Sequence, residues 1–197
     1  MIKSSLLFLL IVCCSSLGCS EGYGTHKGNH VWYSNWNQGS GDRPMLVMDD
    51  VQGELVVLKD HRYAKTEKNV YILGVKIHDA DPATFTTLEY PFSRDKNHVY
   101  CGSLYLIDAD PDGFKLLFQN AMFGMLDRFK KEPFIAQYGE HPALGHEKRY
   151  CTKSAWSTDG KTIYFGYAKV KNANPNTFTA LDGLYGKDDM HVFSAMK

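Results

Sequence analysis

The chain has 197 residues, of which 44% are hydrophobic and 22% are charged, a composition typical of one ordinary globular domain. Its 22 basic residues equal its 22 acidic residues, so the formal net charge is zero. Nucleic-acid binding needs a surplus of lysine and arginine to neutralise phosphates, so it is not expected, and no electrostatic attachment to anionic lipid is expected either. Twelve tyrosines and eleven phenylalanines favour short aromatic β-strands.

Residues 1–18 have the pattern of a secretory signal peptide. A lysine precedes an apolar run that is too short to cross a bilayer as a permanent helix, and small residues follow it. The Ser-Leu-Gly-Cys segment that ends at Cys19 resembles a bacterial lipobox, with serine where leucine is preferred. The two alternatives are acylation of Cys19 and simple cleavage after Gly18.

An acylated Cys19 would turn residues 19–24 into a tether, and several acyl chains would make the membrane anchor stable. Serine at the next position is associated with export to the outer membrane in Gram-negative bacteria. The expected location is therefore the outer membrane, facing the periplasm, or the periplasm itself if Cys19 is not acylated. Such an oxidising compartment favours a disulfide between Cys101 and Cys151, the alternative being two unrelated buried thiols.

Residues 25–197 are expected to form a single repeat domain, because one nine-residue pattern recurs along them. Its copies are YAKTEKNVY (63–71), FSRDKNHVY (92–100), WSTDGKTIY (156–164) and YGKDDMHVF (185–193), with a fainter copy, GTHKGNHVW (24–32). Tyr63 lies 29 positions before Phe92, and Trp156 lies 29 positions before Tyr185. Such a spacing is typical of stacked supersecondary units. Polar corners between aromatic and β-branched runs predict a hairpin in each copy.

A second block begins eight residues after the last aromatic residue of three copies. Its sequences are DADPATF (79–85), DADPDGF (108–114) and NANPNTF (172–178). A side chain such as Asp81 or Asp110 can accept hydrogen bonds from the following backbone, and the proline suits the first position of one helical turn. The closing phenylalanines are expected to hold this turn against the sheet. The sequence therefore predicts a mainly β fold: tandem hairpin-plus-turn repeats of about 29 residues in one antiparallel, meander-like domain.

An insert at residues 119–155 interrupts the pattern. Phe92 and Trp156 are 64 positions apart, six more than two repeats, so either a unit has decayed with six residues added or a foreign element has entered. Apolar residues at helical spacing predict a short amphipathic helix over residues 120–131. Interruptions of repeat proteins often carry binding specificity. The candidate binding residues of the insert are Phe123, Phe129, His141 and His146.

The corner from Asp95 to Tyr100, Asp-Lys-Asn-His-Val-Tyr, and the DADP blocks resemble the DKNYY family, bacterial repeat proteins named for this corner. The resemblance covers about two thirds of the mature chain, and it implies a repeat fold without implying a particular activity. The copy at Trp156, WSTDGKTIYF, is also similar to β-propeller repeats of the TolB kind. Propeller blades are longer, at roughly 40 residues, so this similarity is interpreted as shared hairpin chemistry.

Two groups of residues have the chemistry of metal ligands. Asp108, Asp110 and Asp112 match the first half of an EF-hand loop, but position twelve is glutamine, and the sister blocks lack the third aspartate. Capping explains all three blocks and calcium explains one, so these aspartates are a weak metal candidate. His141 and His146 are residue types that zinc accepts, but their spacing on a loop is a weak signal, and packed or solvated histidines are the simpler interpretation. No cofactor is expected.

No nucleophile elbow, phosphate-binding glycine loop or zinc-protease motif occurs in the chain. The sequence therefore predicts a non-enzymatic envelope module that binds a protein and meets the membrane only through its lipid anchor. One version is an immunity or inhibitor protein against a toxin that acts in the periplasm. A glycan- or cell-wall-binding protein is one alternative, with exposed Trp32, Trp36 and Trp156 stacked on sugar rings. An envelope hydrolase that uses the segment 140–147 is the other.

Overall fold

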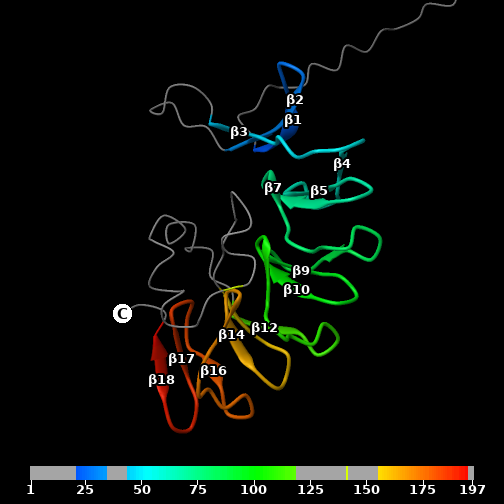
Figure 1. Cartoon of the computed structure of the whole chain (residues 1–197). Coiled ribbons are helices and arrows are strands. Elements are labelled where there is room, and N and C mark those ends of the chain that lie inside the picture. Colours follow the sequence, from blue (N-terminus) through cyan, green and yellow to red (C-terminus); the bar gives the residue numbers. More distant parts are fainter. Residues whose placement is uncertain (1–20, 35–43, 119–140, 142–154, 195–197) are drawn as a thin grey trace, which may run out of the picture.

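The computed structural model describes residues 21–34, 44–118, 141 and 155–194, and these residues form strands and turns without a helix. Eighteen short strands make five small antiparallel sheets, which follow one another in chain order along the molecule (Figure 1). The predicted mainly β fold is therefore confirmed. None of the described residues forms a helix of the length and apolarity that a membrane crossing needs.

We name the sheets A to E in chain order. Sheet A contains β1 (Gly22–His26), β2 (Asn29–Tyr33) and β3 (Met45–Val47). Sheet B contains β4 (Val56–Val57), β5 (Tyr63–Lys65), β6 (Val70–Ile72) and β7 (Val75–Lys76). Sheet C contains β8 (Thr86–Thr87), β9 (Phe92–Arg94), β10 (Val99–Cys101) and β11 (Leu104–Tyr105). Sheet D contains β12 (Lys115–Phe118), β13 (Trp156–Thr158), β14 (Ile163–Phe165) and β15 (Ala168–Lys169), and sheet E contains β16 (Thr179–Ala180), β17 (Tyr185–Lys187) and β18 (Val192–Ser194).

Each predicted nine-residue copy forms a hairpin. In sheets B to E, the aromatic residue that begins the copy is the backbone pairing partner of the residue that directly follows the copy. These pairs are Tyr63 with Ile72, Phe92 with Cys101, Trp156 with Phe165 and Tyr185 with Ser194. The fainter first copy forms the hairpin of β1 and β2. Period-two alternation on short strands then sends one set of side chains toward the next sheet and the other set back toward the previous one.

Contacts between aromatic rings hold each turn block against its own sheet. The phenylalanine that closes each block packs on the first aromatic residue of the preceding hairpin. The centroid distances are 5.9 Å for Tyr63 and Phe85, 5.0 Å for Phe92 and Phe114, and 5.2 Å for Trp156 and Phe178. The prediction that these phenylalanines hold the turn against the sheet is confirmed. Tilted aromatic pairs at this distance stabilise a core beyond the area that they bury.

Three tyrosines tie sheets B, C and D to the chain segments that precede them. Tyr71, Tyr100 and Tyr164 are fully buried. Their hydroxyls donate to backbone carbonyls of the preceding segment, at 3.3 Å to Asp50, 3.2 Å to Asp79 and 3.2 Å to Ile107. The three side chains therefore have matching surroundings, because a buried hydroxyl needs a partner and the preceding turn supplies one.

The connection between sheets A and B depends on a glycine. Leu73 and Gly74 form the two-residue turn between β6 and β7, and both have positive φ angles, of 51° and 77°. A Cβ atom on Gly74 would lie 2.5 Å from the Cβ of Trp32, so only glycine allows sheet A to approach this closely. The turn therefore serves both the hairpin and the packing of the two sheets.

The pairings of sheet D show where the insert lies. Lys115 pairs with Thr158 in the way that Thr86 pairs with Arg94 one sheet earlier. Sheet D also contacts sheet C directly through Tyr164. Within the described residues, no further sheet therefore stands between C and D, and the insert belongs to the connection from β12 to β13. The helix predicted for residues 120–131 lies outside the described residues.

Candidate functional site

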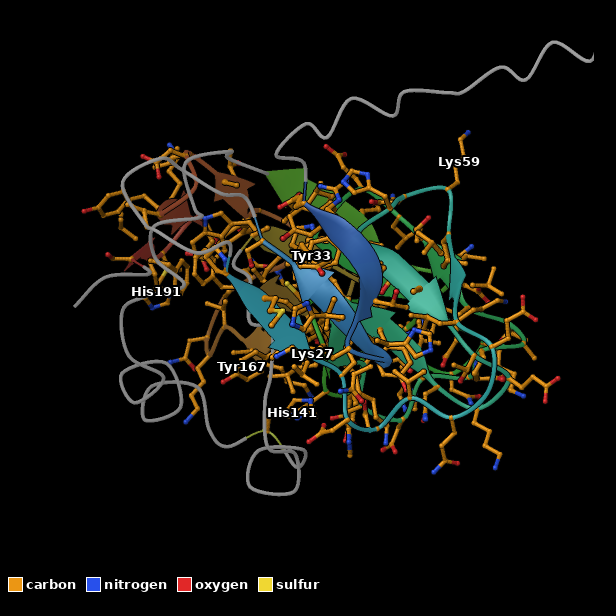
Figure 2. All side chains as sticks on the ribbon, turned by 90° about the horizontal axis from the view of Figure 1, so that it is seen from above. Lys27, Tyr33, Lys59, His141, Tyr167 and His191 are labelled. Carbon is orange, nitrogen blue, oxygen red and sulfur yellow. The ribbon has the colours of Figure 1, made fainter. Side chains whose placement is uncertain are left out.

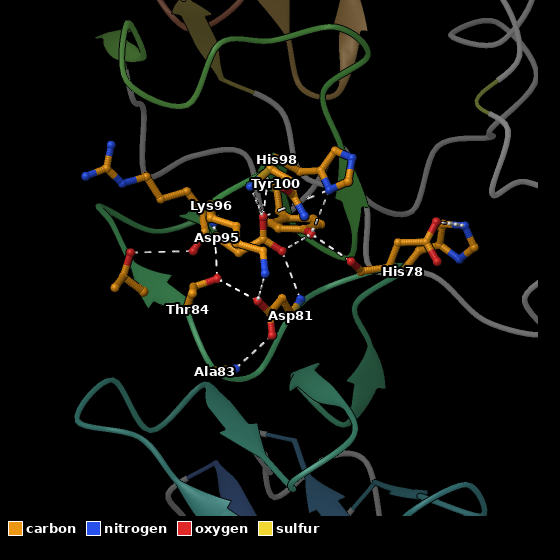
Figure 3. A network of polar contacts seen from close by, with 12 residues as sticks. His78, Asp81, Ala83, Thr84, Asp95, Lys96, His98 and Tyr100 are labelled. Carbon is orange, nitrogen blue, oxygen red and sulfur yellow. Dashed lines mark hydrogen bonds and ion pairs between the residues drawn. The ribbon is translucent and has the colours of Figure 1, made fainter.

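Asp95 is the centre of a polar network at the corner of sheet C (Figure 3). One carboxylate oxygen accepts from the N–H groups of Asn97 and His98, both at 2.8 Å. The other oxygen accepts from the N–H of Asp81 at 2.9 Å and from the hydroxyl of Tyr100 at 2.8 Å. Burial acts to raise the pKa of Asp95, but these hydrogen bonds outweigh it and hold the pKa below its ordinary value.

The corners of sheets D and E repeat this arrangement. Asp159 accepts from the N–H groups two and three residues ahead, at 2.9 and 2.7 Å, and Asp188 does so at 2.8 and 2.6 Å. Each also accepts from the N–H of the preceding turn block, at 3.2 Å from Asp110 and at 2.9 Å from Asn174. The recurring aspartates therefore close their own hairpin and fasten it to the preceding block, a structural role that uses their acceptor capacity.

Two of the three aspartates of the candidate calcium loop are engaged in other contacts, and the third is fully exposed. Asp110 caps its own turn by accepting from the N–H of Asp112 at 3.0 Å, and it pairs with a lysine ammonium at 3.3 Å. Asp108 pairs with Lys169 at 2.6 Å, and the side chain of Asp112 is fully exposed. Asp81 caps its block in the same way, since it accepts from the N–H of residue 83 at 3.0 Å. Among the described residues, no group of three or more His, Cys, Asp or Glu side chains could hold a metal ion.

The tryptophans that were predicted to be exposed are buried, so this expectation is wrong for the two that the structure describes. Trp32 is 3% exposed and lies edge-on against Tyr23, with ring centroids 4.8 Å apart. Trp156 is fully buried against Phe165 and Phe178. The physical reason is that both rings point at a neighbouring sheet of the stack. Neither ring can therefore stack on a sugar.

His141, which with Ala155 is one of the two described residues of the insert, is buried among aromatic rings. Its Nε2–H donates to the carbonyl of Tyr105 at 2.7 Å, and its ring lies 4.4 Å from the ring of Tyr105 and 5.4 Å from that of Tyr167. Figure 2 shows His141 and Tyr167 at the same margin of the molecule. The rings of His98 and His78 also lie near the ring of Tyr105, at centroid distances of 4.9 and 6.1 Å.

Burial lowers the pKa of His141, although the hydrogen bond to the carbonyl of Tyr105 acts against this shift. A buried imidazole with aromatic neighbours is a packing element, which agrees with the interpretation of His141 as a packed histidine. Its suggested zinc partner, His146, lies outside the described residues. Tyr105 and its neighbour His78 were not singled out from the sequence, because His141 and Tyr105 meet through tertiary packing across 36 positions.

A surface of different character lies at the C-terminal end of the stack. Val70, Val99 and Ile163 are buried, but Val192 at the matching place in sheet E is 73% exposed. In the same way, Tyr185 is 39% exposed, whereas the first aromatic residues of the hairpins in sheets B, C and D are buried. Leu181, also in sheet E, is 50% exposed. We call Leu181, Tyr185 and Val192 the open face.

A groove lies elsewhere, over the corner of sheet B, and has a volume of about 700 Å³. Two lysines and two glutamates lie among its lining residues, so it has no preference for one sign of charge. The lining residues are Gln52, Gly53, Glu54, Val56, Lys65, Thr66, Glu67, Lys68, Pro82 and Ala83. The groove brings together none of the residues that the sequence suggested.

Several predicted residues lie outside the described part of the chain. They are Cys19, Trp36, Phe123, Phe129, His146 and Cys151. Cys101 is completely buried in the core of sheet C. The disulfide to Cys151 and the acylation of Cys19 therefore stay predictions.

The family model of the DKNYY family matches residues 63–197, which include sheets C, D and E and most of sheet B. No curated protein matches the chain. No solved structure matches it either.

Proposed function

The chain belongs to the DKNYY family, and on this premise we propose that it is a non-enzymatic, protein-binding module of the bacterial cell envelope. The partner binds at the C-terminal end of the stack, on the open face of sheet E. In the more specific version, the module is an immunity or inhibitor protein that neutralises a toxin acting in the periplasm.

The observation that carries the proposal is the exposure of apolar side chains at positions that form the core elsewhere. Val192 is 73% exposed, whereas Val99 at the matching position of sheet C is completely buried. Burying such a side chain contributes about 1.5 to 3 kcal/mol. Exposed apolar side chains that gain this much from burial are characteristic of protein interfaces.

A second observation argues against catalysis as the role of the recurring aspartates. A general base must have a lone pair free for substrate. Asp95 and Asp159 instead accept four hydrogen bonds each from their own chain, and Asp188 accepts three. The glycan-binding alternative is weakened, because the rings of Trp32 and Trp156, which were to stack on sugars, are buried.

We further propose that residues 1–18 are removed as a signal peptide and that Cys19 carries the lipid anchor, which places the module on the outer membrane, facing the periplasm. Labelling with a fatty-acid analogue tests this proposal. The chain should take up the label, and the substitution Cys19→Ala should abolish uptake and release the protein into the periplasm. Label uptake that persists in the variant would contradict the lipid anchor.

The binding proposal is tested by cross-linking in native envelopes, followed by a titration with the purified partner. The double substitution of Tyr185→Ser and Val192→Asp should weaken binding at least tenfold, which corresponds to about 1.4 kcal/mol. The matched control is Val57→Asp on β4, since Val57 is also an exposed valine, on a different sheet of the stack. The control should bind like the wild type. Equal binding by all three proteins would refute the open face as the binding surface.

A further inference from the structure

A pocket opens between sheets C and D, next to β8, β9 and β12. Its volume is about 330 Å³, which lies within the range of small-molecule binding sites. Four of its six lining side chains are apolar, and the other two are an acid and a base. The lining residues are Leu88, Glu89, Phe92, Arg94, Phe114 and Leu116.

The apolar part of the lining belongs to the core that sheets C and D share. Phe92 is completely buried and packs on Phe114, with ring centroids 5.0 Å apart. Leu88, Phe114 and Leu116 are partly buried against the same core. An apolar group that enters the pocket therefore leaves water and contacts aromatic and aliphatic side chains, which favours its binding.

Glu89 carries a carboxylate that the fold does not use. An acidic residue lies three positions before the first aromatic residue of the hairpin in sheets B, C and E, as Asp60, Glu89 and Asp182. Asp60 and Asp182 each accept from the backbone N–H two residues ahead, at 3.1 and 2.6 Å. Glu89 cannot form this bond, because the residue two positions ahead is Pro91, which has no N–H. Among the described residues, the exposed carboxylate of Glu89 has neither a hydrogen bond nor an ion pair.

Arg94 supplies a cation with unused donors at the same pocket. Its Nη1 donates to the carbonyl of Pro111 at 2.8 Å and lies 3.9 Å from the carboxylate of Asp112. At the matching place in sheet B, the ammonium of Lys65 donates to the carbonyl of Pro82, also at 2.8 Å. A guanidinium has N–H groups on three nitrogens, whereas an ammonium has only one nitrogen. In the part of the chain that the structure describes, Nη2 and Nε of Arg94 have no acceptor.

Glu89 and Arg94 line one pocket, but no ion pair between them occurs in the described structure. Two separate and opposite charges beside an apolar lining are complementary to a molecule that has an ammonium, a carboxylate and an apolar group. We propose that the pocket binds a free α-amino acid with an apolar side chain. Arg94 holds its carboxylate and Glu89 holds its ammonium, both through charge-assisted hydrogen bonds, while its side chain lies among the leucines and phenylalanines. This site is independent of the open face, which lies on sheet E.

Isothermal titration calorimetry of the full chain with L-leucine tests the site. Leucine should bind saturably, and three related molecules should bind about tenfold more weakly or worse. Leucinamide lacks the carboxylate that Arg94 holds, and 4-methylpentanoate lacks the ammonium that Glu89 holds. Alanine keeps both charges but has almost no apolar side chain to bury.

Two substitutions assign the charges to their residues. Arg94→Lys keeps a donor for the carbonyl of Pro111, as Lys65 does for Pro82, but it loses the unused N–H groups, so leucine should bind about tenfold more weakly. Glu89→Gln should weaken leucine binding by a similar factor and leave the binding of 4-methylpentanoate unchanged, because that molecule has no ammonium. The matched control is Glu54→Gln, an exposed glutamate at the groove of sheet B, which should bind leucine like the wild type.

Three results would overturn the inference: no saturable binding of leucine, equal binding of leucine and its two singly charged analogues, or leucine binding that both variants retain in full. Urea denaturation separates a lost site from a lost fold. The midpoint of Glu89→Gln should equal that of the wild type, because no described contact uses the carboxylate of Glu89.

Discussion

Replacing Asp95 with asparagine tests the claim that the recurring aspartates are structural. The variant keeps one oxygen for the two N–H groups of its own corner. Its amide nitrogen, however, replaces the oxygen that accepts from the N–H of Asp81 and from the hydroxyl of Tyr100. The hydroxyl can still donate to the carbonyl of Asp79, 3.2 Å away. The N–H of Asp81 has no such substitute.

The expected loss of stability follows from these contacts. An orphaned buried donor costs about 1 to 3 kcal/mol, and the bonds that keep a partner lose the strength that the negative charge gave them. We therefore expect Asp95→Asn to lower the free energy of unfolding at pH 7 by about 2 to 4 kcal/mol, a large part of the total for a domain of this size. Urea denaturation followed by tryptophan fluorescence measures this loss.

The loss should also depend on pH. The folded-state pKa of Asp95 is below its ordinary value, so its contribution to stability is complete above about pH 4 and falls as the pH drops through the folded-state pKa. The difference between wild type and variant should therefore shrink below pH 4. The control is Asp112→Asn, because the side chain of Asp112 is fully exposed and should change stability by less than about 0.5 kcal/mol. A loss for Asp95→Asn no larger than that of the control would refute the structural role.

Three further predictions concern packing and ionisation. Val99→Asp should lower the free energy of unfolding by about 4 kcal/mol or more, whereas Val192→Asp should change it by less than about 0.5 kcal/mol, because only Val99 is buried. Equal effects of the two substitutions in thermal denaturation would contradict the difference in burial. Gly113→Ala should lower the free energy of unfolding in urea by about 1 to 3 kcal/mol, because the new Cβ would lie 2.5 Å from the carbonyl oxygen of Asp159. The control is Gly22→Ala, because a Cβ on Gly22 has no neighbour within 4 Å. Burial raises the pKa of Tyr71 to about 12, so the free energy of unfolding should decline as the pH rises from about 10 to about 12. Tyr71→Phe should remove part of this decline, which denaturation at each pH measures while the absorbance of tyrosinate follows the ionisation. An unchanged decline in the variant would argue against a raised pKa.

Only part of the candidate site could be predicted from the sequence. The capping role of Asp81 and Asp110 is local, because each side chain bonds to backbone two residues ahead. The burial of Trp32 and of Trp156 is not local, since each ring is covered by residues of another part of the stack. The hydrogen bond between His141 and Tyr105 is not local either, because the two residues are 36 positions apart in the sequence. Periodicity alone cannot separate a buried aromatic residue from an exposed one.

The hairpins and the turn blocks were determined by the sequence itself, because hydrogen bonds between residues a few positions apart specify a polar corner and a capped turn. The tertiary structure alone decided which copies of the pattern are covered. Val99 and Val192 have the same sequence surroundings, an imidazole before them and an aromatic residue after them. The first is buried because another sheet packs on it, and the second is exposed because the described chain places none there. Burial depends on the neighbour in space, and a repeated sequence does not say which copy has one.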